Sequence, residues 1–329
     1  MTSAGTATFE HQACIYGSDR QFLEMAMPFL ETGLDNGEPV LAVTTPANLE
    51  LISSALGARA DDIDYAESAF FGRRPPQRVA AFHRYWRRHD PGCDGARVRI
   101  LAEPVWTGRS AREIAAWKRM ESALNVALAG ASIFMICPYD TRLTGPGIVA
   151  AARRTHPALT DGPQASPSPD YADPAVFTSE SYTRPLPDPP AGAAAFEFNG
   201  DLRGLRQFVA SRAAAHGLAG DRAGLLVQAA GEVGTYLRYL DQGNAAVRTW
   251  EQAGALMCDF RQPDTSISDP FLGLRPAGLD AAPGDGLWLT SQICDWMDIR
   301  SGADGGTIRL QVPGQRNAET AQQGLRYPA

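Results

Sequence analysis

The sequence predicts two α/β domains of different architecture, joined by a proline-rich segment. Before residue 158, short apolar runs alternate with amphipathic stretches, an order typical of a mostly parallel sheet. After residue 196, two amphipathic stretches come first and strand-like runs follow, which indicates an α/β sandwich with helices layered on one antiparallel or mixed sheet. We therefore divide the chain into a first domain over 1–158, a linker over 159–195, a second domain over 196–313 and a C-terminal tail over 314–329.

The strands of the first domain are predicted from apolar runs without period-two alternation, which suits a sheet covered on both faces. These runs are 13–16, 40–44, 98–102 and 132–137. Apolar residues at helical spacing predict the intervening helices, which are 19–34, 46–56, 76–88, 111–128 and 146–154. Ser18 and Ser110 are suited to cap helix N-termini, and Gly33, Gly37 and Gly57 lie where helices are expected to end.

The same criteria order the second domain differently. Amphipathic stretches predict two consecutive helices over 201–217 and 221–240. The remaining predicted elements are strands over 246–251 and 255–261, a long loop, a helix over 287–295, and strands over 297–301 and 306–312.

The proline-rich linker holds eight of the 24 prolines between residues 160 and 195. Proline at this density is expected to exclude helices and sheet ladders alike. We expect an extended segment that lies on the domain surfaces, with Tyr171, Phe177 and Tyr182 as apolar anchors. The alternative is a disordered segment.

Composition excludes several classes of function. The chain carries 30 basic and 37 acidic residues, a net charge of −7, so no direct binding of nucleic acid is expected. No apolar run approaches the ~20 residues of a membrane helix and the N-terminus lacks a signal-peptide pattern, so we expect a cytoplasmic protein without membrane contact. Five scattered cysteines indicate reduced thiols, and five histidines without metal-ligand spacing give no reason to expect a metal.

Polar and aromatic residues follow two predicted strands of the first domain. Glu103, Trp106 and Arg109 come after one strand, and Tyr139 and Asp140 come after another. Parallel α/β sheets bind ligands at the carboxyl ends of their strands. A tryptophan beside an arginine and two carboxylates predicts a cleft for a flat or small organic ligand, held by stacking and charged hydrogen bonds. In the alternative interpretation the charged residues form structural ion pairs, either Arg109–Glu103 or Arg154–Asp140.

Two further candidates for the ligand site lie on one helix. Glu121 and Asn125 are four residues apart and therefore share a face. His11 and His156 are interpreted as buried, hydrogen-bonded histidines with a structural role, His156 near the negative end of a helix dipole.

Six stretches spanning about 9–158 carry a family resemblance: 11–16, 29–40, 103–110, 121–125, 137–140 and 154–157. In order and spacing they resemble the MEDS sensory family, named for methanogens, methylotrophs and the dichloromethane regulator. The resemblance implies a RecA- or KaiC-like fold without a phosphate loop, and Gly-x-x-x-x-Gly-Lys-Ser/Thr is indeed absent. Relatives often carry histidine immediately before the position of Glu121; Met120 stands there in this chain, which weakens a metal or acid/base role.

A second resemblance covers roughly 196–313 and is carried by the stretches 232–236, 258–264, 269–273, 284–288 and 305–310. They look like the histidine-kinase-like ATPase domain of anti-sigma-factor serine kinases. In that family a Glu-x-x-x-Asn helix motif supplies a catalytic base and a magnesium ligand. Here the base position is kept as Glu232, whereas Tyr236, a poor magnesium ligand, replaces the asparagine. The alternative is that Glu232 is simply an exposed helix carboxylate.

The other nucleotide motifs of that family are only partly kept. The alignment puts Gln262 and Asp264 at an Asp-x-Gly motif whose aspartate recognises adenine. Gly284 and Gly286 remain able to form an anion-binding turn at a helix N-terminus. We therefore expect neither ATP nor magnesium as a cofactor. An alternative alignment would make Asp259 the adenine acceptor.

Three functions follow from these patterns. The favoured one is a regulator of the anti-sigma type that senses a signal through the first domain. Its kinase-like domain would bind a sigma factor or a STAS-type anti-anti-sigma protein, with the loop 262–283 as its lid. The alternatives are an active serine kinase acting on an anti-anti-sigma partner, and a small-molecule enzyme using Glu103, Glu121 or Asp140 as acid and base. The altered nucleotide motifs disfavour the kinase, and the lack of an activated nucleophile or metal spacing disfavours the enzyme.

Overall fold

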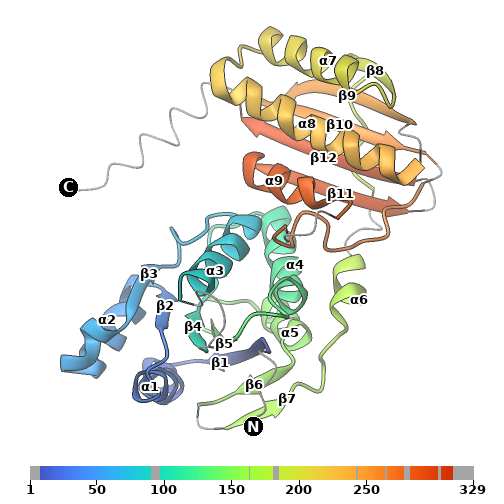
Figure 1. The fold of residues 1–329 in the computed structure, drawn as a ribbon. Coiled ribbons are helices and arrows are strands. Elements are labelled where there is room, and N and C mark those ends of the chain that lie inside the picture. Colours follow the sequence, from blue (N-terminus) through green and yellow to red (C-terminus); the bar gives the residue numbers. More distant parts are fainter. Residues whose placement is uncertain are drawn as a thin grey trace, which may run out of the picture. The chain divides into compact units, whose positions relative to one another are not determined.

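The computed structural model describes residues 8–89, 97–162, 164–180, 185–241, 244–263, 265–277, 282–302 and 305–313. The chain divides into two compact units, 1–178 and 179–329 (Figure 1). Each unit has a hydrophobic core of its own.

The first unit is built on a seven-stranded sheet. Its order is β3 (Asp64–Glu67), β2 (Val40–Thr44), β4 (Val98–Ala102), β5 (Ile133–Asp140), β1 (Glu10–Tyr16), β6 (Ala158–Thr160) and β7 (Ala165–Pro167). Neighbouring strands are parallel except for β6 and β7, which are antiparallel. Every residue of β2 and β4 is buried, as expected for strands covered on both faces. The predicted mostly parallel sheet is confirmed.

The helices in the described part of the first unit are α1 (Asp19–Asp35), α2 (Pro46–Leu56), the 3-10 helix η1 (Gly57–Asp62), α3 (Pro75–His89), α4 (Ala111–Ala127), α5 (Pro146–Thr155) and α6 (Pro174–Ser179). The Ser18 hydroxyl accepts from Gln21 N–H at the start of α1, and Ser110 forms a capping box with Glu113 at the start of α4. The expectation that a helix ends at Gly33 is wrong, because α1 continues to Asp35. Glycine is needed there for close packing: a Cβ would lie 2.7 Å from Arg99 Cδ.

The expectation that the proline-rich linker lacks regular structure is also wrong. β6, β7 and α6 lie within or at the start of it, and the boundary between the units falls at 178/179. The prolines are compatible with these elements because Pro167 ends an edge strand and Pro174 opens a helix, where a missing N–H is tolerated. Phe177 is buried as an anchor, whereas Tyr171 is 37% exposed and Tyr182 lies outside the described residues.

The second unit is a five-stranded antiparallel sheet with helices on one face (Figure 1). The strand order is β11 (Trp296–Gly302), β12 (Gly305–Pro313), β10 (Ala255–Gln262), β9 (Asn244–Gln252) and β8 (Ala194–Asn199). The helices are α7 (Leu202–Ala215), α8 (Gly220–Asp241) and α9 (Asp285–Ile293). This confirms the predicted helices on an antiparallel sheet and adds β8. No helix in the described parts of the chain combines the length and apolar character needed to cross a membrane.

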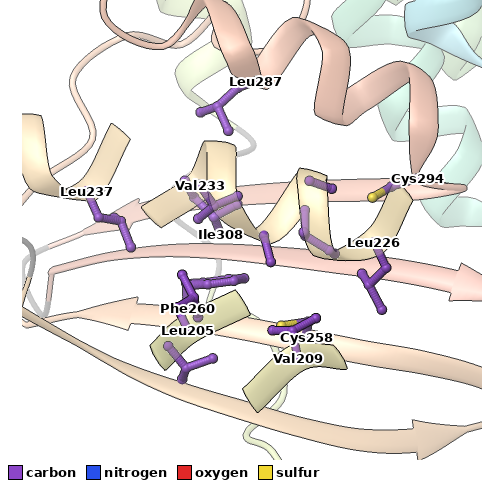
Figure 2. Packing of buried hydrophobic residues seen from close by; sticks show 14 of the residues in the cluster. Leu205, Val209, Leu226, Val233, Leu237, Cys258, Phe260, Leu287, Cys294 and Ile308 are labelled. Atoms are coloured by element: carbon purple, nitrogen blue, oxygen red, sulfur yellow. The ribbon is translucent and has the colours of Figure 1, made fainter. Parts of the chain in front are cut away.

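Side-chain alternation explains how this unit forms its core. Cys258 and Phe260 of β10 and Ile308 of β12 pack in one cluster with Val209 of α7 and Val233 of α8 (Figure 2). The residue between the two β10 positions, Asp259, therefore faces away from the helices. There its Oδ1 accepts a 2.7 Å hydrogen bond from Arg309 Nε within a buried ion pair.

Candidate functional site

A cavity of about 650 Å³ opens at the carboxyl edge of the first sheet. Its walls come from the ends of β1 and β5, the segment after β4, and the N-terminal turns of α1 and α2. Tyr16, Glu103 and Asp140 come from the strand ends, and Asp19 and Asn48 come from the helices. This is the edge at which a parallel α/β sheet is expected to bind ligands.

Glu103 forms the fixed floor of the cavity. Its Oε1 accepts a 2.9 Å hydrogen bond from the Tyr16 hydroxyl, and its Oε2 accepts a 2.8 Å bond from Asn48 Nδ2 and another from the Thr44 hydroxyl. Its backbone carbonyl accepts from Arg78 Nη2 at 3.1 Å. Burial, followed by the Glu103 charge, raises the pKa of Tyr16, so this phenol remains a neutral donor. The floor is therefore an ordered set of polar groups.

Arg142 also lines the cavity and pairs with two aspartates. Its Nε and Nη2 donate to Asp140 Oδ1 and Oδ2 at 2.9 and 2.8 Å, and its Nη1 donates to Asp19 Oδ1 at 2.8 Å. Burial opposes ionisation of Asp140, but these hydrogen bonds outweigh it and lower the pKa of the carboxyl. With Glu50 and Glu103, the lining holds four carboxylates and one guanidinium. Such a cavity favours a ligand that carries positive charge or donates hydrogen bonds.

A second group of polar side chains lies buried inside the first unit. It joins His11 of β1, Glu121 of α4, Cys137 of β5 and His156, which follows α5. One donor atom from each of these residues lies within 4.8 Å of the other three. All four residues are at most 3% exposed. Burial raises the pKa of Glu121 to about 7 and lowers that of His156 to about 4.

Analysis of the sequence missed this cluster. The four residues are far apart along the chain and follow no metal-binding spacing. β1 and β5 pair in parallel, with Ala13 beside Cys137. His11 is two residues from Ala13, so the side chains of His11 and Cys137 point to the same face of the sheet. That signal becomes visible only once the strand order is known.

The predicted ligand residues divide between the cavity and the buried interior. Glu103 and Asp140 line the cavity, whereas Trp106, Arg109 and Tyr139 are not among its lining residues. Tyr139 and Asp140 are neighbours on β5, so their side chains point to opposite faces of the sheet.

The remaining candidates pack within the unit. Trp106 stacks on the Tyr139 ring with centroids 6.2 Å apart, and the Arg109 guanidinium lies 3.9 Å from the centroid of the Trp117 ring. Glu121 belongs to the buried cluster, and Asn125 Oδ1 contacts His11 Nδ1 at 3.1 Å.

The structural ion pairs considered as alternatives involve other partners. Asp140 pairs with Arg142 rather than with Arg154, whose guanidinium lies 4.9 Å from the centroid of the Phe177 ring. The Arg109 Nε donates to the carbonyl oxygen of Val105.

In the second unit, the structure brings together four residues that the second resemblance assigns to a nucleotide site. Glu232 and Tyr236 on α8 face Gly284 and Gly286 at the N-terminus of α9. A Cβ added to Gly284 would lie 3.3 Å from Tyr236 Cε2, and one added to Gly286 would overlap Glu232 Oε2. Side chains of the protein thus occupy the space beside the glycine turn.

The positions predicted to recognise adenine do not join this group in the described residues. Gln262 is 2% exposed, and Asp264 lies outside the described residues. The alternative acceptor, Asp259, is paired with Arg309 on the face away from α8. Asp259 therefore does not lie on the face that carries Glu232 and Tyr236.

The first unit has the geometry of a ligand-binding α/β domain, since a polar cavity lies at the carboxyl edge of its parallel sheet. Residues 10–157 match the family described as MEDS, the methanogen/methylotroph, DcmR sensory domain. This match lies within the first unit and supports a sensory domain there, which suggests a signal-sensing regulatory role. Comparison with curated proteins finds no matching relative.

Proposed function

We propose that this chain is a signal-sensing regulator of transcription of the anti-sigma type. In this proposal the first unit, a RecA/KaiC-like domain without a phosphate loop, binds a small organic ligand in the cavity at its carboxyl edge. The second unit, of the histidine-kinase-like ATPase type, binds a sigma factor or a STAS-type anti-anti-sigma protein. It does so without ATP or magnesium.

The sensing role rests on one observation. The match to a sensory family and a polar cavity fall on the same unit, and the cavity lies where such sheets bind ligands. Its lining contains apolar side chains such as Leu51 and Leu143 beside the carboxylates and Arg142. This mixture supports a small organic molecule with a cationic or hydrogen-bond-donating group.

Two features support a second unit that binds a protein partner without ATP: side chains fill the space beside its glycine turn, and its helices expose apolar side chains. The Glu232 carboxylate lies beside Gly286 at the positive end of α9, where a phosphate would otherwise interact. The Tyr236 ring packs beside Gly284 in the same way. The helices also expose Leu225, Tyr239 and Leu289, apolar side chains suited to a protein partner.

Ligand binding is tested by thermal-shift measurements with a panel of small amines, amides, alcohols and carboxylates. Amines or amides should stabilise the wild-type protein, and Asp19→Asn should weaken that response. Asp35→Asn is the matched control, because Asp35 lies at the opposite end of α1, is not among the residues that line the cavity, and also pairs with an arginine, Arg59 of η1. A lack of response to every compound class, or an equal loss in both variants, would contradict the cavity as the site.

The second unit is tested by calorimetry with Mg-ATP and by pairwise co-purification with sigma factors and STAS-type proteins of the same organism. No heat of ATP binding is expected, because Tyr236 removes a magnesium ligand and the turn is filled. A defined complex with one of these partners in the absence of ATP is expected. Micromolar ATP affinity would instead support the active kinase.

A further inference from the structure

We propose that His11, Glu121, Cys137 and His156 bind one zinc ion in the interior of the first unit. This site is separate from the cavity and does not depend on the proposed function. Each of the four residues comes from a different part of the fold: β1, α4, β5 and the residue after α5.

Three of the six distances between the donor atoms are close to those of a tetrahedral ion, and the other three are at most 4.8 Å. With bonds of about 2.0–2.2 Å to nitrogen or oxygen and about 2.3 Å to sulfur, the edges of a tetrahedral zinc site measure about 3.3 to 3.7 Å. His11 Nε2 lies 3.4 Å from Cys137 Sγ and 3.8 Å from Glu121 Oε2, and His156 Nε2 lies 3.6 Å from Glu121 Oε2. Closure around the ion requires shifts of only a few tenths of an ångström on these three edges.

The hydrogen bonds around the two imidazoles determine which nitrogen faces the cluster. His156 Nδ1 lies 2.8 Å from the carbonyl oxygen of Ala152, so Nδ1 carries the proton. Asn125 uses its amide group to donate to the carbonyl oxygen of Thr155, which leaves Asn125 Oδ1 to accept from His11 Nδ1 at 3.1 Å. Both Nε2 atoms therefore present lone pairs, as zinc-binding histidines supported by second-shell acceptors do.

His156 Nε2 and Glu121 Oε2 lie 3.6 Å apart without a hydrogen bond between them. Glu121 Oε2 and His156 Nε2 are buried atoms with no hydrogen-bond partner among the described residues. A buried acceptor without a partner costs about 1–3 kcal/mol, and a zinc ion bound by both atoms would remove that cost.

The donor set favours zinc over magnesium or calcium. Two imidazoles and a thiolate are ligands of borderline softness, whereas magnesium and calcium take oxygen ligands. The Cys137 thiolate and the Glu121 carboxylate together neutralise a divalent charge, which suits a buried site. Since all four positions come from protein, the site is of the closed, structural type. Occupancy links residues 11 and 156, close to the two ends of the domain, and so couples metal binding to its folding.

The test uses the full chain, purified under reducing conditions without chelators. Elemental analysis should find about one zinc per chain. After zinc is removed, titration with Co(II) should give the visible bands of tetrahedral cobalt and a near-ultraviolet thiolate-to-cobalt charge-transfer band. Asn125→Ala removes the second-shell support of His11, together with the amide hydrogen bonds to the carbonyl oxygens of Ser122 and Thr155, and should weaken zinc binding about 10- to 100-fold.

Matched variants identify the ligands. Cys137→Ser should abolish the charge-transfer band, and His156→Gln should lower the zinc content, whereas Cys14→Ser on β1 and His83→Gln on α3 should leave both unchanged. A folded wild-type protein that contains no zinc and shows no thiolate-to-cobalt band would overturn the proposal, as would a Cys137→Ser variant that keeps the band. Stoichiometric iron or copper in place of zinc would overturn the choice of metal.

Discussion

The buried cluster of the first unit and the glycine turn of the second unit differ in what fills the space between converging residues. In the cluster, lone pairs of Glu121 and His156 face each other without a hydrogen bond between them. In the turn, Glu232 and Tyr236 of the protein itself occupy the space beside Gly284 and Gly286. Convergence of suitable residues therefore does not define a binding site by itself. The two sites differ in whether side chains of the protein already fill the space: they do so beside the glycine turn, whereas in the cluster no described side chain provides a hydrogen-bond partner for Glu121 Oε2 or His156 Nε2.

Removal of zinc should have the largest effect, and it should act on the first unit alone. A ligand present at about a thousandfold above its Kd stabilises the state that binds it by about 4 kcal/mol. Hydrogen exchange followed by mass spectrometry should show that strands β1 and β5 lose protection on chelation, while β9, β10 and β12 keep theirs. Equal loss in both units would mean that the chelator acts on something other than this cluster.

The sequence predicted most helices to within about two residues, because caps such as Ser110 and the helical spacing of apolar residues are local signals. It missed β3, whose residues Asp64–Glu67 are exposed or half-buried and lack an apolar run. It missed β7 because Pro167 at its end is a strand breaker except at an edge.

The candidate site was predictable only in part, for a physical reason. Glu103 and Asp140 follow directly from the rule that ligands lie at strand ends. The buried cluster depends on the sheet order, which places β1 beside β5, and on the face to which each side chain points. Neither is encoded in any local stretch of sequence.

Arg78→Met should have the next largest effect, because Arg78 is the buried cation that connects the floor of the cavity with the interior. Its guanidinium donates to the carbonyl oxygens of Ser68, Phe71 and Glu103 at 3.0–3.1 Å, and it is 1% exposed. Loss of these bonds should lower the free energy of unfolding by about 3 kcal/mol in urea denaturation. Arg84→Met, at an exposed position on the same helix, should change it by less than about 0.5 kcal/mol. Equal effects of the two would show that Arg78 has no special role.

Gly286→Ala should lower the free energy of unfolding moderately, and the size of the loss shows how closely side chains pack against the glycine turn. The added methyl group overlaps the Glu232 carboxylate, and overpacking of this kind costs about 1–2 kcal/mol. The double variant Glu232→Ala with Gly286→Ala should recover most of the loss. Gly224→Ala, at a helical position of α8 with open space around it, should be neutral or slightly stabilising. If the double variant is no more stable than Gly286→Ala, then Glu232 does not fill the turn.

Arg142→Gln should have the smallest effect, because the rim of the cavity contributes less to folding than the buried cluster does. The Arg142 side chain is 44% exposed, and exposed ion pairs contribute about 1 kcal/mol or less. The loss should also depend on pH, since Arg142 lowers the pKa of Asp140. A lowered pKa contributes stability above the pKa of the unfolded state, and that contribution disappears as the pH falls through the folded-state pKa. Urea denaturation should therefore show a lower free energy of unfolding for the variant than for the wild type at neutral pH, and this difference should vanish in acid. The control is Arg59→Gln, whose partner Asp35 is 66% exposed; it should change the free energy of unfolding little at either pH. If Arg142→Gln lowers the free energy of unfolding by about 3 kcal/mol or more, Arg142 contributes as much to folding as a buried residue. The rim of the cavity would then not differ from the interior in its contribution to stability.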